Sequence, residues 1–433
     1  MIWDVANECC SREALERVQL SRLRETLSRV YARVEHYRRS FDEHGVHPDQ
    51  LRTLADLQRF PFLTKHEILQ HYPFGMLAVP FREVVRIHSS SGTTGNPLVV
   101  GYSRCDLEIW SEMVARIVCA AGVTSEDVVQ IAFSYGLFTG GFGLHYGLER
   151  VGAAVVPASG GNTERQIRLM RDFGTTALVC TPTYALHIAE VAPELSVDPE
   201  SLKLRLGLFG SEPWSEAIRR EIEAKLGLFA TDNYGLSEVV GPGVSGECQC
   251  RCGLHINEDH FLVEVIDPDT LEVLPEGEVG ELVFTTLTKE AFPVVRYRTR
   301  DISRITREPC ECGRTNARME RVRGRTDDML IVRGVNVFPS QIEAVLLEIE
   351  GTEPHYQIVV DRKGALDDLE VWVEVSENVF VDEWKQLAAL QQRIQRRLET
   401  VLGISVRIKL VEPKSIERTV GKAKHVVDRR TLT

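Results

Sequence analysis

Two short apolar runs enclose the stretch Ser89-Ser90-Ser91-Gly92-Thr93-Thr94-Gly95-Asn96-Pro97, which holds five hydroxyl side chains and two glycines. The flanking runs at 84–87 and 98–100 have the composition of strands. A turn of small residues lets backbone N–H groups approach an anion closely, and hydroxyls add donors to phosphate oxygens. The stretch therefore indicates a loop that binds a triphosphate, although an isolated Ser/Gly/Thr turn is more often only a flexible hairpin. It is not a Walker A loop, because no Gly-Lys-Ser/Thr follows at the required spacing.

Length and composition describe an ordinary globular chain. The 433 residues predict two or three domains, and 43% are hydrophobic and 26% charged. The net charge of −12 argues against a nucleic-acid partner. No apolar run reaches the roughly 18 residues of a membrane span, and the N-terminus lacks a signal-peptide pattern. We expect a cytoplasmic protein with no membrane partner and with mostly reduced cysteines.

The middle of the chain alternates between strand and helix patterns. An amphipathic helix is predicted first, over 13–38. Buried strands are then predicted at 128–133, 153–158, 177–182 and 204–210, with helices at 140–151, 163–173 and 184–192 between them. This rhythm predicts a parallel sheet covered on both faces, with ligands bound beyond the carboxyl ends of its strands.

The fold class that follows is α/β: a large N-terminal α/β domain with parallel sheets and a β-rich subdomain, plus a small mobile α+β C-terminal domain. The N-terminal domain is predicted at 1–326, with a helical segment at about 1–75 and a β-rich part at about 245–326. The C-terminal lid is predicted at 327–433, from a hairpin, a helix at 340–349, two strands, a helix at 382–402 and a last strand.

Four further stretches carry charge at turns or after strand-like runs: Tyr234-Gly235-Leu236-Ser237-Glu238, Tyr297-Arg298-Thr299-Arg300-Asp301, Gly324-Arg325-Thr326-Asp327-Asp328 and Gly421-Lys422-Ala423-Lys424. Each one alone is more often a turn or a salt bridge. Their order and spacing, together with the loop at 89–97, resemble the adenylate-forming superfamily of acyl-CoA synthetases over nearly the whole chain. Within it the chain is most similar to the phenylacetate-CoA ligases, through 135–141, 210–213, 234–244, 258–261 and 297–301.

The resemblance implies roles for individual residues. The phosphate loop comprises Ser90, Ser91, Gly92, Thr93, Thr94 and Gly95. Thr94 and Glu238 position Mg²⁺, and catalysis rests on both of them with Lys422, which bridges the carboxylate and the α-phosphate. The remaining ATP- or AMP-binding residues are Ser211, Glu212, Pro213, Asp232, Asn233, Tyr234 and Gly235 around adenine, with Asp301 and Arg325 at the ribose. Asp327 is the hinge, and Arg333 and Gly334 face the thioester site in the second domain orientation. The chain departs from the family at Asn96, where the loop usually has Lys.

The acid and CoA pocket is expected to include Tyr135, Phe138, Gly140 and Gly141, which follow a predicted strand at its carboxyl end. The aromatic rings would bury an aryl group, and the glycines, with Gly143, would leave room for the ring and for close backbone approach. The alternative is that these aromatics, Phe142 above all, only pack the following helix onto the sheet. His145, His187 and His260 are interpreted as structural, or for His260 as fixing a loop, because adenylation needs no base.

Two clusters of soft ligands occur in the β-rich part. The spacing of Cys248 and His255 with Cys310 and Cys312 indicates a closed structural zinc site. Cys250 or Cys252 could take the place of Cys248, and the alternative to a metal is surplus reduced thiols.

The expected function is ATP-dependent conversion of an aryl or arylacetic acid to its acyl-AMP and then to its CoA thioester. The expected cofactors are ATP, Mg²⁺, coenzyme A and a structural Zn²⁺. Two alternatives stay open. One is an adenylate-forming enzyme with another acceptor, as in coenzyme F390 synthetase or carrier-protein loading. The other is a non-catalytic scaffold. The identity of the acid is not set by the sequence, and the oligomeric state is open, a homodimer included.

Overall fold

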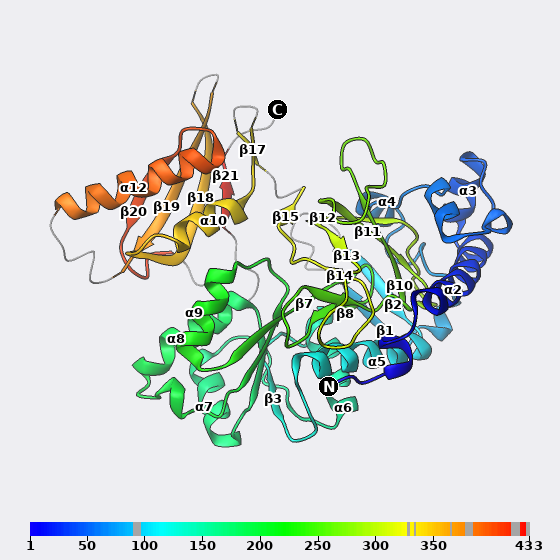
Figure 1. The fold of residues 1–433 in the computed structure, drawn as a ribbon, viewed down its shortest axis with the longest axis horizontal. Coiled ribbons are helices and arrows are strands. Elements are labelled where there is room, and N and C mark those ends of the chain that lie inside the picture. Colours follow the sequence, from blue (N-terminus) through cyan, green and yellow to red (C-terminus); the bar gives the residue numbers. More distant parts are fainter. Residues whose placement is uncertain are drawn as a thin grey trace.

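The computed structural model describes residues 1–89, 97–326, 330–332, 335–363, 366–376, 384–416 and 425–429. A larger body, blue to yellow, holds the N-terminal three quarters of the chain, and a smaller orange and red body holds the rest (Figure 1). The predicted phosphate loop and parts of the predicted lid lie outside the described residues. The fold can therefore be compared with the sequence prediction element by element, except in these segments.

The N-terminal segment is helical, but its main helix is interrupted. It contains α1 (Val5–Glu8), α2 (Arg12–Arg33), α3 (Glu35–Glu43), α4 (Lys65–Gln70) and the short 3₁₀ turns η1 (Pro48–Gln50), η2 (Leu54–Arg59) and η3 (Phe81–Glu83). The single helix predicted over 13–38 was wrong, because Val34 has extended backbone angles, φ −115° and ψ 111°. The bend buries Val34 and turns Tyr37 and Phe41 into the same core as α2, so tertiary packing overrides the helical periodicity.

A nine-stranded sheet forms the centre of the larger body, in the order β13-β14-β9-β8-β7-β6-β5-β3-β4. Its parallel half consists of β3 (Val128–Ile131), β4 (Ala154–Val156), β5 (Ala177–Cys180), β6 (Leu206–Gly210) and β7 (Phe229–Leu236). Helix α5 (Arg104–Ala121) precedes β3, and the elements between the parallel strands are α6 (Thr139–Val151), α7 (Thr163–Phe173), α8 (Pro182–Glu194), the 3₁₀ turn η4 (Pro199–Ser201) and α9 (Glu216–Leu226). The predicted alternation of strands and helices is confirmed.

The second half of the larger body is antiparallel. The nine-stranded sheet continues with β8 (Gly241–Glu247), β9 (Leu254–Ile256), β14 (Arg318–Met319) and β13 (Ile305–Thr306). A separate four-stranded sheet contains β10 (Phe261–Ile266), β11 (Gly280–Thr286), β12 (Tyr297–Ser303) and β15 (Gly324–Arg325). The predicted phosphate loop connects β1 (Arg86–Ser89) and β2 (Val99–Tyr102), an antiparallel pair.

The smaller body has its own hydrophobic core. It contains β16 (Leu330–Val332), β17 (Val335–Val337), α10 (Pro339–Leu347), β18 (Thr352–Lys363), β19 (Leu366–Val375), α12 (Trp384–Leu402), β20 (Arg407–Val411) and β21 (Val426–Asp428). These agree with the α+β elements predicted for this region. Two ion pairs connect it to α8 of the larger body, His355 to Glu190 at 3.0 Å and Lys414 to Glu194 at 2.5 Å.

Local sequence signals explain where the central helices begin and end. The hydroxyl oxygens of Ser103, Thr181 and Ser215 accept the first free backbone N–H groups of α5, α8 and α9. Helix α5 ends at Gly122, which has φ +110°, a conformation that glycine adopts without steric cost. Among the described residues, no helix is both long enough and apolar enough to cross a membrane.

Candidate functional site

The predicted adenine-binding segments lie side by side at the carboxyl ends of two parallel strands. Gly210 ends β6 and pairs in parallel register with Asn233 of β7. The side-chain amide of Asn233 donates to the carbonyl of Phe209 at 2.5 Å and so adds a bond between β7 and β6. A Cβ at Gly210 would lie 2.4 Å from the Asn233 carbonyl oxygen, so only glycine fits this close approach.

The residues after β6 are held in a defined conformation. Ser211 has φ +72°, a strained value for a residue with a side chain. The Glu212 carboxylate accepts the backbone N–H of Thr183 at 2.8 Å, at the start of α8. Burial, and then the nearby Glu247, raises the pKa of the Asp232 carboxyl to about 7. Asp232 is half-buried beside the buried Glu247, which accepts its backbone N–H at 2.8 Å, whereas Ser211 is exposed.

The two sheets meet at Asp301. One oxygen of its carboxylate accepts the hydroxyl of Tyr234 at 2.6 Å, and the other accepts Nη1 of Arg325 at 2.8 Å. Asp301 on β12 and Arg325 on β15 are register partners, and Tyr234 comes from β7 of the other sheet. Burial, and then Asp301, raises the pKa of Tyr234 well above its usual value, so its hydroxyl stays a donor. The contacts from Tyr234 and Arg325 hold both oxygens of the Asp301 carboxylate in fixed positions.

Glu238 occupies the turn between β7 and β8 and is 8% exposed. The ammonium of Lys65, at the start of α4, lies 3.8 Å from its Oε1. The preceding hydroxyl of the turn, on Ser237, lies 3.1 Å from the Thr139 hydroxyl. Lys65 was not predicted as a site residue, because an isolated lysine after a helix cap gives no signal in the sequence. The turn presents one carboxylate, which suits a hard cation such as Mg²⁺.

Several predicted site residues lie outside the described residues, so their positions stay predictions. They are Ser90, Ser91, Gly92, Thr93, Thr94, Gly95, Asp327, Arg333, Gly334 and Lys422. The base of the phosphate loop is described, however. The backbone N–H of Ser89 donates to the carbonyl of Leu137 at 2.9 Å, which places the start of the loop against the predicted acid-pocket segment.

That segment contains a chain of polar contacts around Tyr135. Its hydroxyl lies 3.1 Å from Nδ1 of His145, whose Nε2 lies 3.1 Å from Glu149 on the same helix. The Tyr135 ring also meets Phe142 edge to face, with centroids 5.2 Å apart. Burial raises the pKa of Tyr135, so the phenol stays neutral. His145 thus contacts a predicted pocket residue, a link that the sequence did not reveal.

The glycines of α6 were expected to leave room for a substrate ring and for close backbone approach, and the structure shows which protein atoms lie against them. A Cβ at Gly140 would lie 2.3 Å from the Phe138 ring, and one at Gly141 would lie 2.7 Å from the Ser134 carbonyl oxygen. A Cβ at Gly143 would lie 2.4 Å from the Trp110 ring. Protein atoms already fill these positions, so the glycines permit tight packing of α6 instead of an open space.

Four soft ligands converge in the β-rich part. The ligand atoms of Cys248, His255, Cys310 and Cys312 lie within 4.8 Å of one another. The sulfurs of Cys248 and Cys310 are 3.7 Å apart, and the Cys312 sulfur is 3.3 Å from Nε2 of His255. Two sulfurs bound to one tetrahedral zinc at about 2.3 Å lie about 3.8 Å apart, so the set fits a closed zinc site.

The thiols of this set differ in acidity. Burial alone would raise the pKa of Cys312, but its hydrogen bond with His255 lowers that pKa to about 5. Burial raises the pKa of Cys310. Cys252 is exposed, and its sulfur contacts the Cys250 carbonyl at 3.2 Å, away from the cluster of ligand atoms. Among the described residues, Cys248 is thus the thiol of this loop that lies in the cluster.

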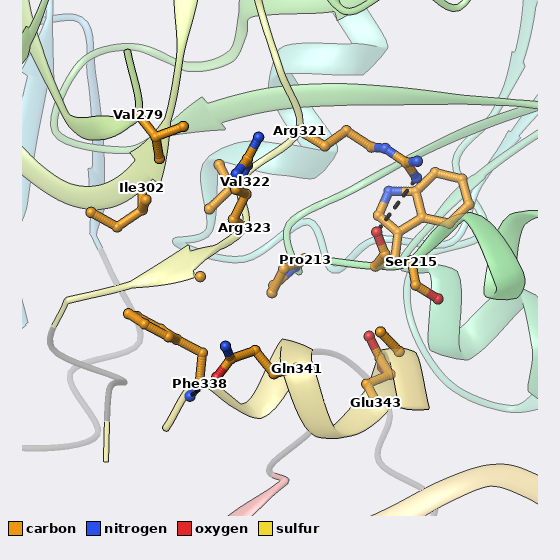
Figure 2. A pocket seen from close by; sticks show the side chains of 13 residues that line it. Pro213, Ser215, Val279, Ile302, Arg321, Val322, Arg323, Phe338, Gln341 and Glu343 are labelled. Carbon is orange, nitrogen blue, oxygen red and sulfur yellow. Dashed lines mark hydrogen bonds between the residues drawn. The ribbon is translucent and has the colours of Figure 1, made fainter. Parts of the chain in front are cut away.

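A cavity of about 550 Å³ opens between the two bodies of the chain (Figure 2). In the larger body it is lined by 213–215, Ile302 and 321–324, which directly adjoin the residues predicted to bind adenine and ribose. On the other side it is lined by Phe338, Gln341 and Glu343 at the start of α10. Figure 2 shows Pro213 and Ser215 across the cavity from Gln341 and Glu343. The cavity therefore borders the residues predicted to bind the nucleotide, and the aromatic residues around Tyr135 do not line it.

Comparison with known proteins gives two family matches. Residues 78–287 match the AMP-binding enzyme family, and residues 334–430 match the AMP-binding enzyme C-terminal domain. A phenylacetate-coenzyme A ligase of Thermus thermophilus is 50% identical over 444 residues, covering 99% of this chain and all of the relative. The phenylacetate-coenzyme A ligase of Escherichia coli is 48% identical, covering 98% of this chain and 97% of the relative.

Solved structures add the arrangement of the two bodies. A 2-hydroxyisobutyryl-CoA ligase in its postadenylation state, bound to 2-HIB-AMP, is 30% identical and superposes with a TM-score of 0.93 over 99% of this chain and 92% of that one. The same ligase in its thioesterification state, with 2-HIB-AMP and CoA, has the same coverage and a TM-score of 0.73. Because sequence and coverage are the same, the difference lies in conformation. The two bodies of this chain are therefore arranged more like those of the first structure than like those of the second.

Proposed function

The chain belongs to the AMP-binding enzyme family, in the group of the phenylacetate-coenzyme A ligases, and on this premise we propose its reaction. It is an AMP-forming acid–thiol ligase. It activates an arylacetic or aryl acid with ATP to the acyl-AMP and transfers the acyl group to coenzyme A. The products are the acyl-CoA, AMP and pyrophosphate. The observation that carries this conclusion is the identity of about half of all residues, over the full length, with ligases of this activity.

In the first half-reaction a carboxylate oxygen of the acid attacks the α-phosphorus of ATP. The new P–O bond forms as the bond to the bridging oxygen breaks, and pyrophosphate leaves. Several negative charges meet here, so catalysis is mainly positioning and charge neutralisation. We assign the ribose hydroxyls to Asp301, which Tyr234 and Arg325 hold in place. The adenine is assigned to the adjacent segments 211–213 and 232–235.

We assign Mg²⁺ binding to Glu238 and to Thr94 of the phosphate loop, and the metal would neutralise charge on the leaving pyrophosphate. Ser90 to Gly95 would supply backbone and hydroxyl donors to the β- and γ-phosphates. Tyr135 and Phe138 are assigned to the acid, beside the base of the loop at Ser89. The hydrogen bond from Ser89 to Leu137 supports this placement, because it keeps phosphate loop and acid pocket adjacent.

In the second half-reaction the CoA sulfur attacks the acyl carbon, a C–S bond forms, and AMP leaves with the electron pair of the broken C–O bond. We propose that residues 327–433 act as a lid that turns about Asp327. Lys422 would serve adenylation, and Arg333 and Gly334 would face the thioester site after the turn. The similarity to a postadenylation structure supports the first orientation. Coenzyme A is the acceptor of the relatives, which favours it over a deazaflavin or a carrier-protein thiol.

We also propose that Cys248, His255, Cys310 and Cys312 hold a structural zinc. These four side chains would occupy all four coordination positions of a tetrahedral zinc. No position would then remain open for a water or a substrate, as a catalytic zinc needs. The site would join the end of β8, strand β9 and the loop between β13 and β14. The low pKa of Cys312 supports the proposal, because zinc binds the thiolate.

The proposed function is tested by pyrophosphate release from ATP over a panel of aromatic and aliphatic acids, with and without CoA. Release that requires an aryl acid, together with AMP and acyl-CoA formation on adding CoA, supports it. Acyl-AMP formation without any CoA thioester contradicts the proposed acceptor. Absence of any acid-dependent pyrophosphate release contradicts the whole assignment.

A further inference from the structure

We propose that Lys289 is a positioning residue for the reaction, because its buried ammonium holds the turn that carries Glu238. This inference rests on the proposed role of Glu238 in binding Mg²⁺. Lys289 lies in the loop between β11 and β12, far from Glu238 in sequence. Its Nζ donates a hydrogen bond of 2.8 Å to the carbonyl of Val239, the residue directly after Glu238.

The surroundings of Lys289 are unusual for a lysine. The residue is 6% exposed, and no carboxylate of the described residues lies within 4 Å of its ammonium. Instead the ammonium lies over the Tyr102 ring, 4.8 Å from its centroid, and near the Phe292 ring at 5.4 Å. Burial lowers its pKa to about 8. An ammonium buried without a close counter-charge destabilises a fold, so stability alone does not explain this lysine.

The same turn is tied at a second carbonyl. The hydroxyl of Tyr102 donates to the carbonyl of Val240 at 2.9 Å. The backbone N–H groups of Val239 and Val240 both donate to the carbonyl of Leu236 at 3.1 Å, which closes the turn around Glu238. Lys289 and Tyr102 therefore fix the two successive carbonyls that follow the metal-binding carboxylate. The position of Glu238 depends on both contacts.

Lys289 is itself held rigidly. The Asp106 carboxylate of α5 accepts the backbone N–H of Glu290 at 2.6 Å and that of Ala291 at 3.0 Å. These bonds fix the loop immediately after Lys289 against the central helix. A rigid support of this kind is what a metal-binding carboxylate needs, since a small displacement of a ligand weakens binding strongly. The charges of Asp106 and Glu238 only partly offset the effect of burial on the Lys289 ammonium, whose pKa stays lowered.

A neutral side chain of similar length provides the test. Lys289→Met removes the donor and the charge but fills the same space. We expect it to raise the Mg²⁺ concentration for half-maximal pyrophosphate release at least tenfold, as measured with other outer contacts of metal ligands. The dissociation constant of AMP, which is bound through Asp301, should change less than twofold. Lys225→Met removes a lysine that pairs with Glu221 at 2.6 Å on α9 and serves as the matched control, with both values unchanged.

Two further measurements keep the inference falsifiable. If Lys289→Met does not fold, Tyr102→Phe removes only the bond to Val240 and should shift the Mg²⁺ requirement in the same direction by a smaller factor. An unchanged Mg²⁺ requirement in the folded Lys289→Met or Tyr102→Phe protein overturns the inference. An equal loss of AMP binding and Mg²⁺ response would mean a merely structural role and overturns it as well. If the wild-type protein releases no pyrophosphate, the proposed function fails first, and the two failures are thus distinguished.

Discussion

The substitution Asp301→Asn tests the nucleotide site most sharply. The two carboxylate oxygens accept Tyr234 at 2.6 Å and Arg325 at 2.8 Å, and Asp301 is 6% exposed. Asparagine has nearly the same shape, but it is neutral and offers a single acceptor oxygen. If that oxygen keeps the contact with Arg325, the amide N–H₂ takes the place of the second acceptor. The ribose then loses at least one bond to a charged acceptor.

The expected magnitude follows from this geometry. A hydrogen bond to a charged group contributes about 1.5–3 kcal/mol. With about 1.4 kcal/mol per tenfold change, the AMP dissociation constant should rise roughly 10- to 150-fold. The ribose is bound alike in the ground state and the transition state. We therefore expect KM for ATP to rise by a similar factor, whereas kcat and KM for the acid change little.

Calorimetric titration with AMP and an ATP titration of pyrophosphate release measure both quantities. Tyr234→Phe keeps the charge of Asp301 and its contact with Arg325, so its effect should be smaller. Asp269→Asn, in an exposed loop, is the matched control and should leave AMP binding unchanged. A folded Asp301→Asn protein that binds AMP within twofold of the wild type would refute the assignment of the ribose to Asp301.

Four other predictions follow from the site and its surroundings. Lys422→Ala should slow acyl-AMP formation by about 10²–10³-fold yet spare thioester formation from supplied acyl-AMP, and equal loss in both steps would contradict the moving lid. Cys310→Ser should remove about one zinc per chain and lower the Tm, whereas wild-type protein without zinc after chelator-free purification would exclude the site. Tyr135→Ala should reduce the preference for aryl over straight-chain acids more than it weakens ATP binding, as competing-substrate assays would show. Burial lowers the pKa of His260 to about 4, whereas its pKa in the unfolded chain is about 6.5. Between these two values the unfolded state binds more protons than the folded state, so the protein loses stability as the pH falls from 6.5 to 4. His260→Gln should reduce the difference in unfolding free energy between pH 7 and pH 5 by about 2 kcal/mol, and an unchanged difference would exclude this cause.

The alternation of apolar runs predicted the parallel half of the large sheet well. Strands such as β5 are buried on both faces, so their composition alone distinguishes them from the amphipathic helices between them. Helix boundaries were harder to predict where packing decides. The break at Val34 carries no glycine or proline, and it forms because Tyr37 and Phe41 are buried together with it. A single sequence does not contain that tertiary preference.

Some residues of the candidate site could be predicted from motifs, whereas contacts made by tertiary packing could not. The pairing of Asp301 with Tyr234 joins two sheets, yet both residues were found, because each lies in a recognisable motif. The contacts that Lys65, Lys289 and His145 make with the predicted site segments were not predicted. Lys289 approaches Glu238 only through a loop fixed by Asp106, and no local pattern marks such a contact. The sequence shows that α6 is rich in glycine, but it does not show which neighbouring atoms lie against these glycines.

The central claim is that this chain makes an aryl-CoA thioester through an acyl-AMP. The most direct measurement is the specificity constant for acyl-CoA formation with phenylacetate, compared with hexanoate and octanoate, at fixed ATP and CoA. The products are identified by mass spectrometry, with AMP and pyrophosphate quantified in the same reactions. The account predicts phenylacetyl-CoA and AMP in equal amounts, with a higher specificity constant for phenylacetate than for either straight-chain acid. No CoA thioester from any aryl acid, or a higher specificity constant for octanoate, would contradict it.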